Sequence, residues 1–188
     1  VEMNFDFTDD QRAIRDTFER FCDQRIAPQA AALDEARAFP RALFGELAEL
    51  GLFGMRYPEA VGGSGVGLLE FSLALAEVAR GSMSLAGAAA MQSLMGTKFL
   101  QMLGNADIVE RLFKPALRGA KIGAICMTEP DAGSDLASLR TRADRAGDEY
   151  VLTGHKVWTS YSDDADWCLV LARTDPDAPK HRGITAFL

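Results

Sequence analysis

The sequence has few histidines and cysteines, and both shortages limit its chemistry. The two histidines, His155 and His181, have no second ligand at metal spacing, so a histidine-built metal site is not predicted. The three cysteines, Cys22, Cys126 and Cys168, are far apart and form no C-x-x-C motif, which is typical of reduced thiols in a cytosolic protein. We therefore expect no disulfide, no metal site and a cytoplasmic location.

An excess of positive charge and a long apolar run are also missing. Lys and Arg number 20 against 27 Asp and Glu, a net charge of −7, so nucleic acid and anionic membrane surfaces are not predicted partners. The most apolar stretch, 83–103, carries Gln92, Lys98 and Gln101, and falls short of the roughly 20 apolar residues that span a bilayer. No export signal is visible in residues 1–16. We expect 83–103 to be a buried helix and predict no membrane insertion.

Common nucleotide and hydrolase motifs are absent as well. The glycine-rich run 62–67 does not match G-x-G-x-x-G in register and follows a proline-containing loop instead of a strand. There is no G-x-x-x-x-G-K-[ST], and Ser64 misses G-x-S-x-G because Val66 occupies the last position. Phosphoryl transfer and hydrolase chemistry are therefore not predicted.

The first two thirds of the chain has helical periodicity. Thr8 and Gln11 have the spacing of a capping box, Asn105 can cap a later helix, and Gly51 and Gly119 can supply left-handed residues at helix ends. The apolar spacing predicts helices over 8–26, 40–50, 68–80, 83–103 and 106–117. Residues 1–120 are therefore expected to form an all-helical domain.

From Lys121 the pattern changes to short apolar runs between turn residues. Strands are predicted over 122–128, 139–145, 149–153, 156–161, 167–173 and 183–188, with tight turns at 147–148 and 154–155. A helical half followed by a strand half indicates an α+β fold, with a second domain over 121–188. The last strand stops at Leu188 with no turn after it, so we expect the chain to be cut within a sheet.

Two polar segments stand out in the strand half. C-M-T-E-P-D-A-G-S-D at 126–135 places a strand end, a proline and a Gly-Ser turn in succession, which suits either a ligand loop or an ordinary polar turn. Glu129 and Asp135 in it would discourage an anion unless they point away. L-T-G-H-K-V-W-T-S at 152–160 contains Trp158, which is either a core aromatic or a ligand contact.

Both segments resemble signatures of the acyl-CoA dehydrogenase family of flavoproteins. M-T-E-P-x-A-G-S-D at 127–135 is similar to the first, and T-G-x-K-x-W-[IT]-[ST] at 153–160 to the second, in the same order and spacing. The resemblance implies a helical N-terminal domain, a β-barrel-like middle domain and a helical C-terminal domain, with FAD between the last two. By this resemblance the chain holds the first domain and part of the second, and we expect it to be an incomplete, inactive portion.

The resemblance also implies residue roles. Thr128 is expected near the pyrimidine edge of the flavin, Trp158 over one face of the ring, and Thr159 and Ser160 at its N5 edge. Ser134 is expected near the flavin phosphates and the pantetheine arm of the substrate. The predicted cofactor-binding residues are Ile125, Met127, Thr128, Gly133, Ser134, Trp158, Thr159 and Ser160, with Ser134 also binding substrate.

The implied reaction is α,β-desaturation of an acyl-CoA thioester, in which a carboxylate removes the α-proton and the β-hydrogen leaves as hydride to flavin N5. The family places that base in the C-terminal domain, so no catalytic residue is assigned here. Electrons are expected to pass to an electron-transfer flavoprotein, and the protein to be a homo- or hetero-oligomer, a dimer or tetramer. The alternatives are a flavin monooxygenase or oxidase on the same scaffold, and a non-catalytic subunit that completes another chain's flavin site.

Overall fold

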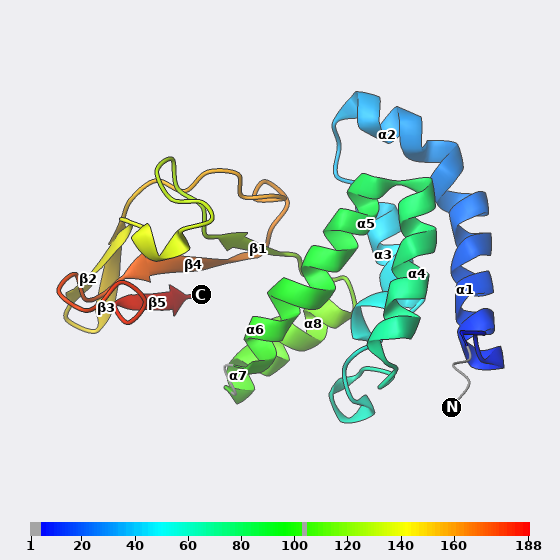
Figure 1. The fold of residues 1–188 in the computed structure, drawn as a ribbon, viewed down its shortest axis with the longest axis horizontal. Coiled ribbons are helices and arrows are strands. Elements are labelled where there is room, and N and C mark those ends of the chain that lie inside the picture. Colours follow the sequence, from blue (N-terminus) through cyan, green and yellow to red (C-terminus); the bar gives the residue numbers. More distant parts are fainter. Residues whose placement is uncertain (1–4, 103–104) are drawn as a thin grey trace. The chain divides into compact units, whose positions relative to one another are not determined.

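The structure is a computed structural model that describes residues 5–102 and 105–188, and it divides into two compact units, 1–121 and 122–188 (Figure 1). The first unit is helical and the second is built on a sheet, as the α+β prediction requires. None of the helices in these two described ranges has the length and apolar character needed to cross a membrane.

The helical unit contains eight α-helices joined by short π and 3-10 turns among the described residues. They are α1 (Asp9–Phe21), α2 (Ala30–Ala36), α3 (Arg41–Glu49), α4 (Leu68–Gly81), α5 (Met83–Ala90), α6 (Thr97–Met102), α7 (Ala106–Ile108) and α8 (Lys114–Leu117). Helix α1 packs along α4, and α4 along α5 (Figure 1). The core of the helical unit includes the buried side chains of Phe44, Phe53, Phe71 and Phe113.

The predicted caps are confirmed. The Thr8 hydroxyl accepts a hydrogen bond from the backbone N–H of Gln11 (3.2 Å), and the Gln11 side chain accepts one from the backbone N–H of Thr8 (3.0 Å). Asn105 accepts from the N–H groups of residues 107 and 108. Gly51 and Gly119 adopt left-handed φ angles of 81° and 66° after α3 and α8. These local signals position the ends of the helices.

Several features of the helical unit differ from the prediction, including π turns at Cys22–Ile26 and Val109–Phe113 inside the predicted helices 8–26 and 106–117. Helix α2 was not predicted, and Pro40 is the N-cap of α3, one position before the helix begins. The predicted helix over 83–103 contains a π turn at Met91–Gly96, where the Gln92 carbonyl accepts from the backbone N–H of Thr97. The Thr97 hydroxyl also lies within hydrogen-bond distance of the carbonyls of Gln92 (2.8 Å) and Ser93 (3.1 Å). Its last predicted residue, Leu103, lies outside the described residues.

The second unit is a five-stranded sheet. Its strands are β1 (Gly123–Cys126), β2 (Arg142–Ala146), β3 (Glu149–Thr153), β4 (Trp167–Arg173) and β5 (Ile184–Phe187). The strand order is β1-β4-β2-β3, with β5 paired to β4. Strand β4 runs parallel to β1 and β2 and antiparallel to β5, and β2 and β3 form an antiparallel hairpin around Gly147.

The predicted strand over 156–161 is wrong. Trp158 and Tyr161 have φ angles of 58° and 63°, in the left-handed region, which a β-ladder cannot continue. Gly154 and His155 therefore do not form a hairpin turn, because residues 156–161 form no strand to pair with β3. The predicted strand over 139–145 begins only at Arg142, after a 3-10 turn at Leu136–Ser138.

Candidate functional site

The two polar segments meet in the sheet unit. The Lys156 ammonium donates to the carbonyl oxygen of Met127 (3.0 Å) and to Glu129 Oε1 (2.8 Å). The backbone N–H of Val157 donates to the carbonyl oxygen of Thr128 (2.9 Å). Three consecutive residues of the first segment are thus bonded to two consecutive residues of the second.

Glu129 is buried and fully engaged. Its Oε2 accepts from the backbone N–H of Arg140 (2.6 Å), and its Oε1 accepts from that of Thr141 (2.9 Å) in addition to Lys156. Burial raises the pKa of the Glu129 carboxyl, but the hydrogen bonds from Lys156, Thr141 and Arg140 outweigh burial and hold the pKa at about 2. A carboxylate held in its charged form by three donors is poorly suited to accept a proton at neutral pH.

The glycine of the second segment is required by a close approach. A Cβ atom at Gly154 would lie 2.2 Å from Thr141 Oγ1 and 2.7 Å from Thr141 Cα. Because the second of these atoms is backbone, no side-chain rotation would relieve the contact. Gly154 therefore brings the second segment against the start of β2, where Thr141 also binds Glu129.

The first segment turns tightly between Glu129 and Ala132, which exchange two backbone hydrogen bonds (2.9 and 3.2 Å). The turn leaves Gly133 and Ser134 exposed. The next residue, Asp135, accepts from Ser138 Oγ and from Lys180 Nζ, and these two contacts, the first being larger, lower the pKa of its carboxyl. Both acidic groups that sequence reasoning regarded as unfavourable to an anion are thus paired with lysines.

Trp158 is displayed to solvent. Trp158 is 89% exposed, so its indole is not part of the core. Its left-handed backbone, rare for a bulky residue, costs on the order of 1–2 kcal/mol. Because the indole is exposed, side-chain packing within the sheet unit does not offset this backbone cost. Trp158 is therefore a candidate ligand contact.

Four side-chain hydroxyl groups of the two segments could donate hydrogen bonds to a ligand. Within the described ranges, the side chains of Thr128, Ser134, Thr159 and Ser160 make no hydrogen bond to the protein. Ser134 and Ser160 are exposed, and Thr128 and Thr159 are half-buried. These residues can offer hydroxyl groups to a polar ligand beside the exposed indole.

The other predicted site residues contribute differently. Ile125 is only 8% exposed in β1, opposite Leu169 of β4, so its side chain offers little surface to a ligand. The carbonyl of Met127 is occupied by Lys156. Ser134 has no hydrogen bond to the second segment in the part of the chain that the structure describes. The structure thus joins 127–129 to 156–157 directly and places Ser134 beyond the turn.

Sequence reasoning missed the Lys156–Glu129 ion pair that connects the segments. The two side chains retain only 11% and 6% of their exposure. The available signal was one lysine and one glutamate in two polar segments, although it did not specify which acid would be buried. Among the described residues, no group of three or more His, Cys, Asp or Glu side chains is arranged to hold a metal ion.

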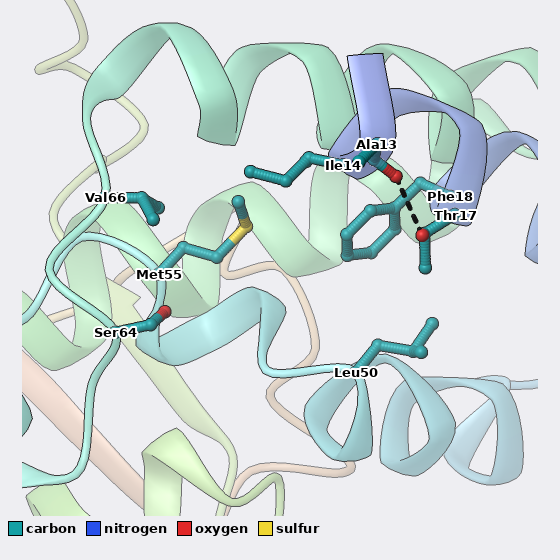
Figure 2. A pocket seen from close by; sticks show the side chains of 8 residues that line it. All are labelled: Ala13, Ile14, Thr17, Phe18, Leu50, Met55, Ser64 and Val66. Carbon is teal, nitrogen blue, oxygen red and sulfur yellow. Dashed lines mark hydrogen bonds between the residues drawn. The ribbon is translucent and has the colours of Figure 1, made fainter. Parts of the chain in front are cut away.

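The helical unit contains a cavity of about 360 Å³ between α1 and the loop that carries Ser64 and Val66 (Figure 2). It is lined by Ala13, Ile14, Thr17, Phe18, Leu50, Met55, Ser64 and Val66. None of these side chains is titratable, and the Thr17 hydroxyl donates to the carbonyl of Ala13 (2.8 Å). The cavity lacks the acid, base or charged group that a catalytic centre needs.

The structure defines a protein with a helical unit and a sheet unit, and the sheet unit carries an exposed aromatic ring beside several hydroxyl groups. Comparison with known proteins specifies the class further. The chain belongs to the acyl-CoA dehydrogenase family: the model of the acyl-CoA dehydrogenase N-terminal domain matches residues 8–120, and that of the middle domain matches 124–188.

Relatives with known names support the same family. The chain is 71% identical over 186 residues to benzylmalonyl-CoA dehydrogenase of Aromatoleum aromaticum, covering 99% of this chain and 48% of that protein. Its fold is similar to butyryl-CoA dehydrogenase of Megasphaera elsdenii (TM-score 0.87, 30% identity, 98% of this chain and 49% of that one). It is also similar to a glutaryl-CoA dehydrogenase of Mycobacterium smegmatis in complex with FADH2 (TM-score 0.88, 29% identity, 96% and 47%). The chain spans about half the length of these proteins.

Proposed function

We propose that the protein containing this chain is an FAD-dependent acyl-CoA dehydrogenase. The observation that carries the proposal is the exposed, left-handed Trp158 beside hydroxyl groups that have no described protein partner, in a chain of this family. A planar ring system with polar edges fits such a surface, because the indole can cover an aromatic face while the hydroxyls meet the edge. One similar structure holds the reduced form of this cofactor.

Each site residue has a proposed role toward FAD. Trp158 covers one face of the isoalloxazine, Thr128 binds its pyrimidine edge, and Thr159 and Ser160 donate at the N5 edge. When bound, the flavin supplies the hydride acceptor for the β-hydrogen of the substrate. A donor at the N5 edge withdraws electron density from the accepting atom, and an ordinary neutral hydrogen bond there is worth about 0.5–1.5 kcal/mol.

The remaining residues complete the proposed binding surface. Ile125, Met127 and Gly133 contribute backbone contacts, and Ser134 binds the flavin phosphates and the pantetheine arm of the acyl-CoA. No residue described here is assigned as the base that removes the α-proton. Glu129 in particular is charged and already holds three donors, so another carboxylate must serve.

The substrate we propose is an aryl-substituted malonyl thioester such as benzylmalonyl-CoA. The support is the 71% identity to benzylmalonyl-CoA dehydrogenase over nearly the whole chain. In this substrate the β-carbon is benzylic, so loss of its hydride is assisted by the adjacent ring. An electron-transfer flavoprotein as acceptor, a homo- or hetero-oligomeric state and a cytoplasmic location are further proposals, which follow from the family resemblance and from the free cysteines.

Anaerobic mixing of the FAD-loaded protein with benzylmalonyl-CoA tests this function. We expect the oxidised flavin absorbance to bleach within seconds, and to bleach much more slowly with butyryl-CoA. Reoxidation by an electron-transfer flavoprotein should outpace reoxidation by O₂. Rapid O₂ turnover with a hydroxylated product would instead indicate a monooxygenase, and FAD binding only together with a second chain would indicate a partner subunit. Either result would overturn the proposal.

A further inference from the structure

We propose that Lys156 and Glu129 are positioning residues, whose buried ion pair holds the backbone at Trp158 and Thr128 in the arrangement that receives the ring. The inference rests on the proposed function, because it assigns the pair a task toward the same ligand surface. It concerns neither proton transfer nor direct contact with FAD.

The bonds of Lys156 lie on both sides of Thr128. The ammonium holds the carbonyl of Met127 and the carboxylate of Glu129, which precede and follow Thr128 in the chain. The carbonyl of Thr128 itself is held by the N–H of Val157. Thr128 and the residues on either side of it are therefore all hydrogen-bonded to the second segment. Lys156, which makes two of these bonds, lies two positions before Trp158.

Trp158 has little else to keep its unfavourable backbone conformation. Its indole is 89% exposed and so receives little packing from the described residues. Among the described residues, the backbone hydrogen bond nearest to Trp158 is the one from the Val157 N–H to the Thr128 carbonyl, next to the contacts of Lys156. A left-handed bulky residue persists only where the surrounding structure determines it, and here the determining contacts are those of residues 156 and 157.

The other end of the pair is anchored to the sheet. Glu129 accepts from the backbone of Arg140 and Thr141, immediately before β2, and Thr141 is 4% exposed. Gly154, two residues before Lys156, lies against the same Thr141. Glu129 thus contacts both Thr141 and Lys156, and Gly154 of the same segment as Lys156 also lies against Thr141. Through these contacts the backbone next to Trp158 is held against the β2–β3 hairpin.

The chemistry of the pair explains why neutral groups would not substitute. The ammonium uses two of its three donors on acceptors more than 20 residues away in sequence, and the carboxylate accepts at both oxygens. A glutamine at position 129 would keep the shape but present an amide N–H₂ to one of the donors. Glu129→Gln is therefore a test that removes the pairing with minimal change in volume.

Hydrogen exchange of the chain with Lys156→Met tests the inference without FAD. We expect exchange of the Val157 amide to accelerate about tenfold or more, while amides of the β2–β3 ladder change less than about twofold. Lys114→Met is the matched control, because Lys114 pairs with an exposed Glu110 in the helical unit, and it should leave Val157 unchanged. If Lys156→Met fails to fold, Glu129→Gln provides the same comparison.

A second readout connects the pair to the ligand. In the FAD-loaded protein, either variant should weaken FAD retention about tenfold and alter the visible circular dichroism of the flavin, while Lys114→Met does neither. Unchanged Val157 exchange in a folded variant, or equal acceleration throughout the β2–β3 ladder, would overturn the positioning role. Absence of FAD binding in the unmodified protein would overturn the proposed function instead, and leaves the exchange result as a separate test.

Discussion

Residues of the proposed site in the sheet unit are of two kinds, buried residues that connect its segments and exposed residues that we propose contact the ligand. Lys156 and Glu129 have almost no exposed side chain, whereas Trp158 is nearly all exposed. Substitutions of the two kinds should therefore differ in their effects on ligand binding and on stability. Changing an exposed ligand contact affects binding without affecting stability, and changing a buried anchor affects both.

Trp158→Ala should weaken FAD retention while leaving the melting temperature within about 1 °C of the unmodified protein. Removing a stacked aromatic face costs about 1 kcal/mol beyond area burial, or roughly fivefold in affinity. The exposed indole contributes little to the fold. Equilibrium dialysis with FAD and a thermal melt check both parts, with Phe5→Ala as control because Phe5 is 82% exposed at the start of the helical unit. Unchanged dialysis would remove Trp158 from the site.

Ser160→Ala should slow flavin reduction by about two- to tenfold with little change in acyl-CoA affinity. The expected size follows from the loss of one neutral hydrogen bond at the N5 edge, worth about 0.5–1.5 kcal/mol. Stopped-flow reduction and a separate binding titration distinguish the two effects, and Ser162→Ala is a control two residues away on the exposed turn. A variant that loses acyl-CoA affinity but reduces at the normal rate would reassign Ser160 to the substrate.

The Glu129 carboxyl should make stability depend on pH in the acid range. Its pKa is lowered from 4.5 to about 2 in the folded chain, so its contribution is fully present above pH 4.5 and is lost as pH falls toward 2. Full protonation should remove on the order of 3 kcal/mol of unfolding free energy. Urea unfolding between pH 5 and pH 2 should show this loss in the unmodified chain and a smaller one in Glu129→Gln. Parallel pH profiles of the two chains would contradict the assignment.

At the scale of elements, the junction of the second segment with β2 depends on one glycine. Gly154→Ala places a methyl group 2.7 Å from the Thr141 Cα, so backbone must move and stability should fall by about 1–3 kcal/mol. Gly45→Ala in α3 is the matched control, because a Cβ there meets nothing within 4 Å and the change should be neutral or stabilising. Urea unfolding of both variants measures the difference. Equal stabilities would show that the close approach is not maintained in solution.

The elements also show which parts of the fold the sequence could predict. Caps and left-handed glycines are local, so Thr8, Asn105, Gly51 and Gly119 were predicted correctly from neighbouring residues. The π turn at Met91–Gly96 was not predicted, and a long-range contact lies at its end. Thr97 and Tyr57, 40 residues apart, share a buried contact of 2.7 Å there, and nothing in the local period reveals it.

Long-range contacts also lie where the predicted strand at 156–161 is wrong. The alternation of apolar and polar residues from Lys156 to Tyr161 favours a strand. In the structure, however, the Lys156 side chain and the Val157 N–H donate hydrogen bonds to the first segment. The backbone then adopts a left-handed conformation at Trp158. The two segments of the proposed site could be recognised in the sequence, whereas the ion pair that joins them could be found only in the fold. The sequence thus indicated which residues could bind a ligand, but it did not predict how these residues contact one another.

At the scale of the whole molecule, the two units correspond to different domains of the family. The helical unit matches the family's N-terminal domain and contains an apolar cavity without titratable groups, while the sheet unit matches the middle domain and contains all the proposed flavin contacts. The chain spans about half the length of its relatives, so substrate, acceptor and assembly are proposals for the protein as a whole.

The central claim is that the surface displayed by Trp158 receives the flavin ring, and an experimental structure of the FAD-loaded protein tests it most directly. We predict the isoalloxazine over the Trp158 indole with ring centroids about 4.5–7 Å apart, and hydroxyls of Thr128, Thr159 or Ser160 within hydrogen-bond distance of the ring's polar edge. The Lys156–Glu129 pair should be intact beneath them. A flavin bound elsewhere, with Trp158 still in solvent, would contradict the account.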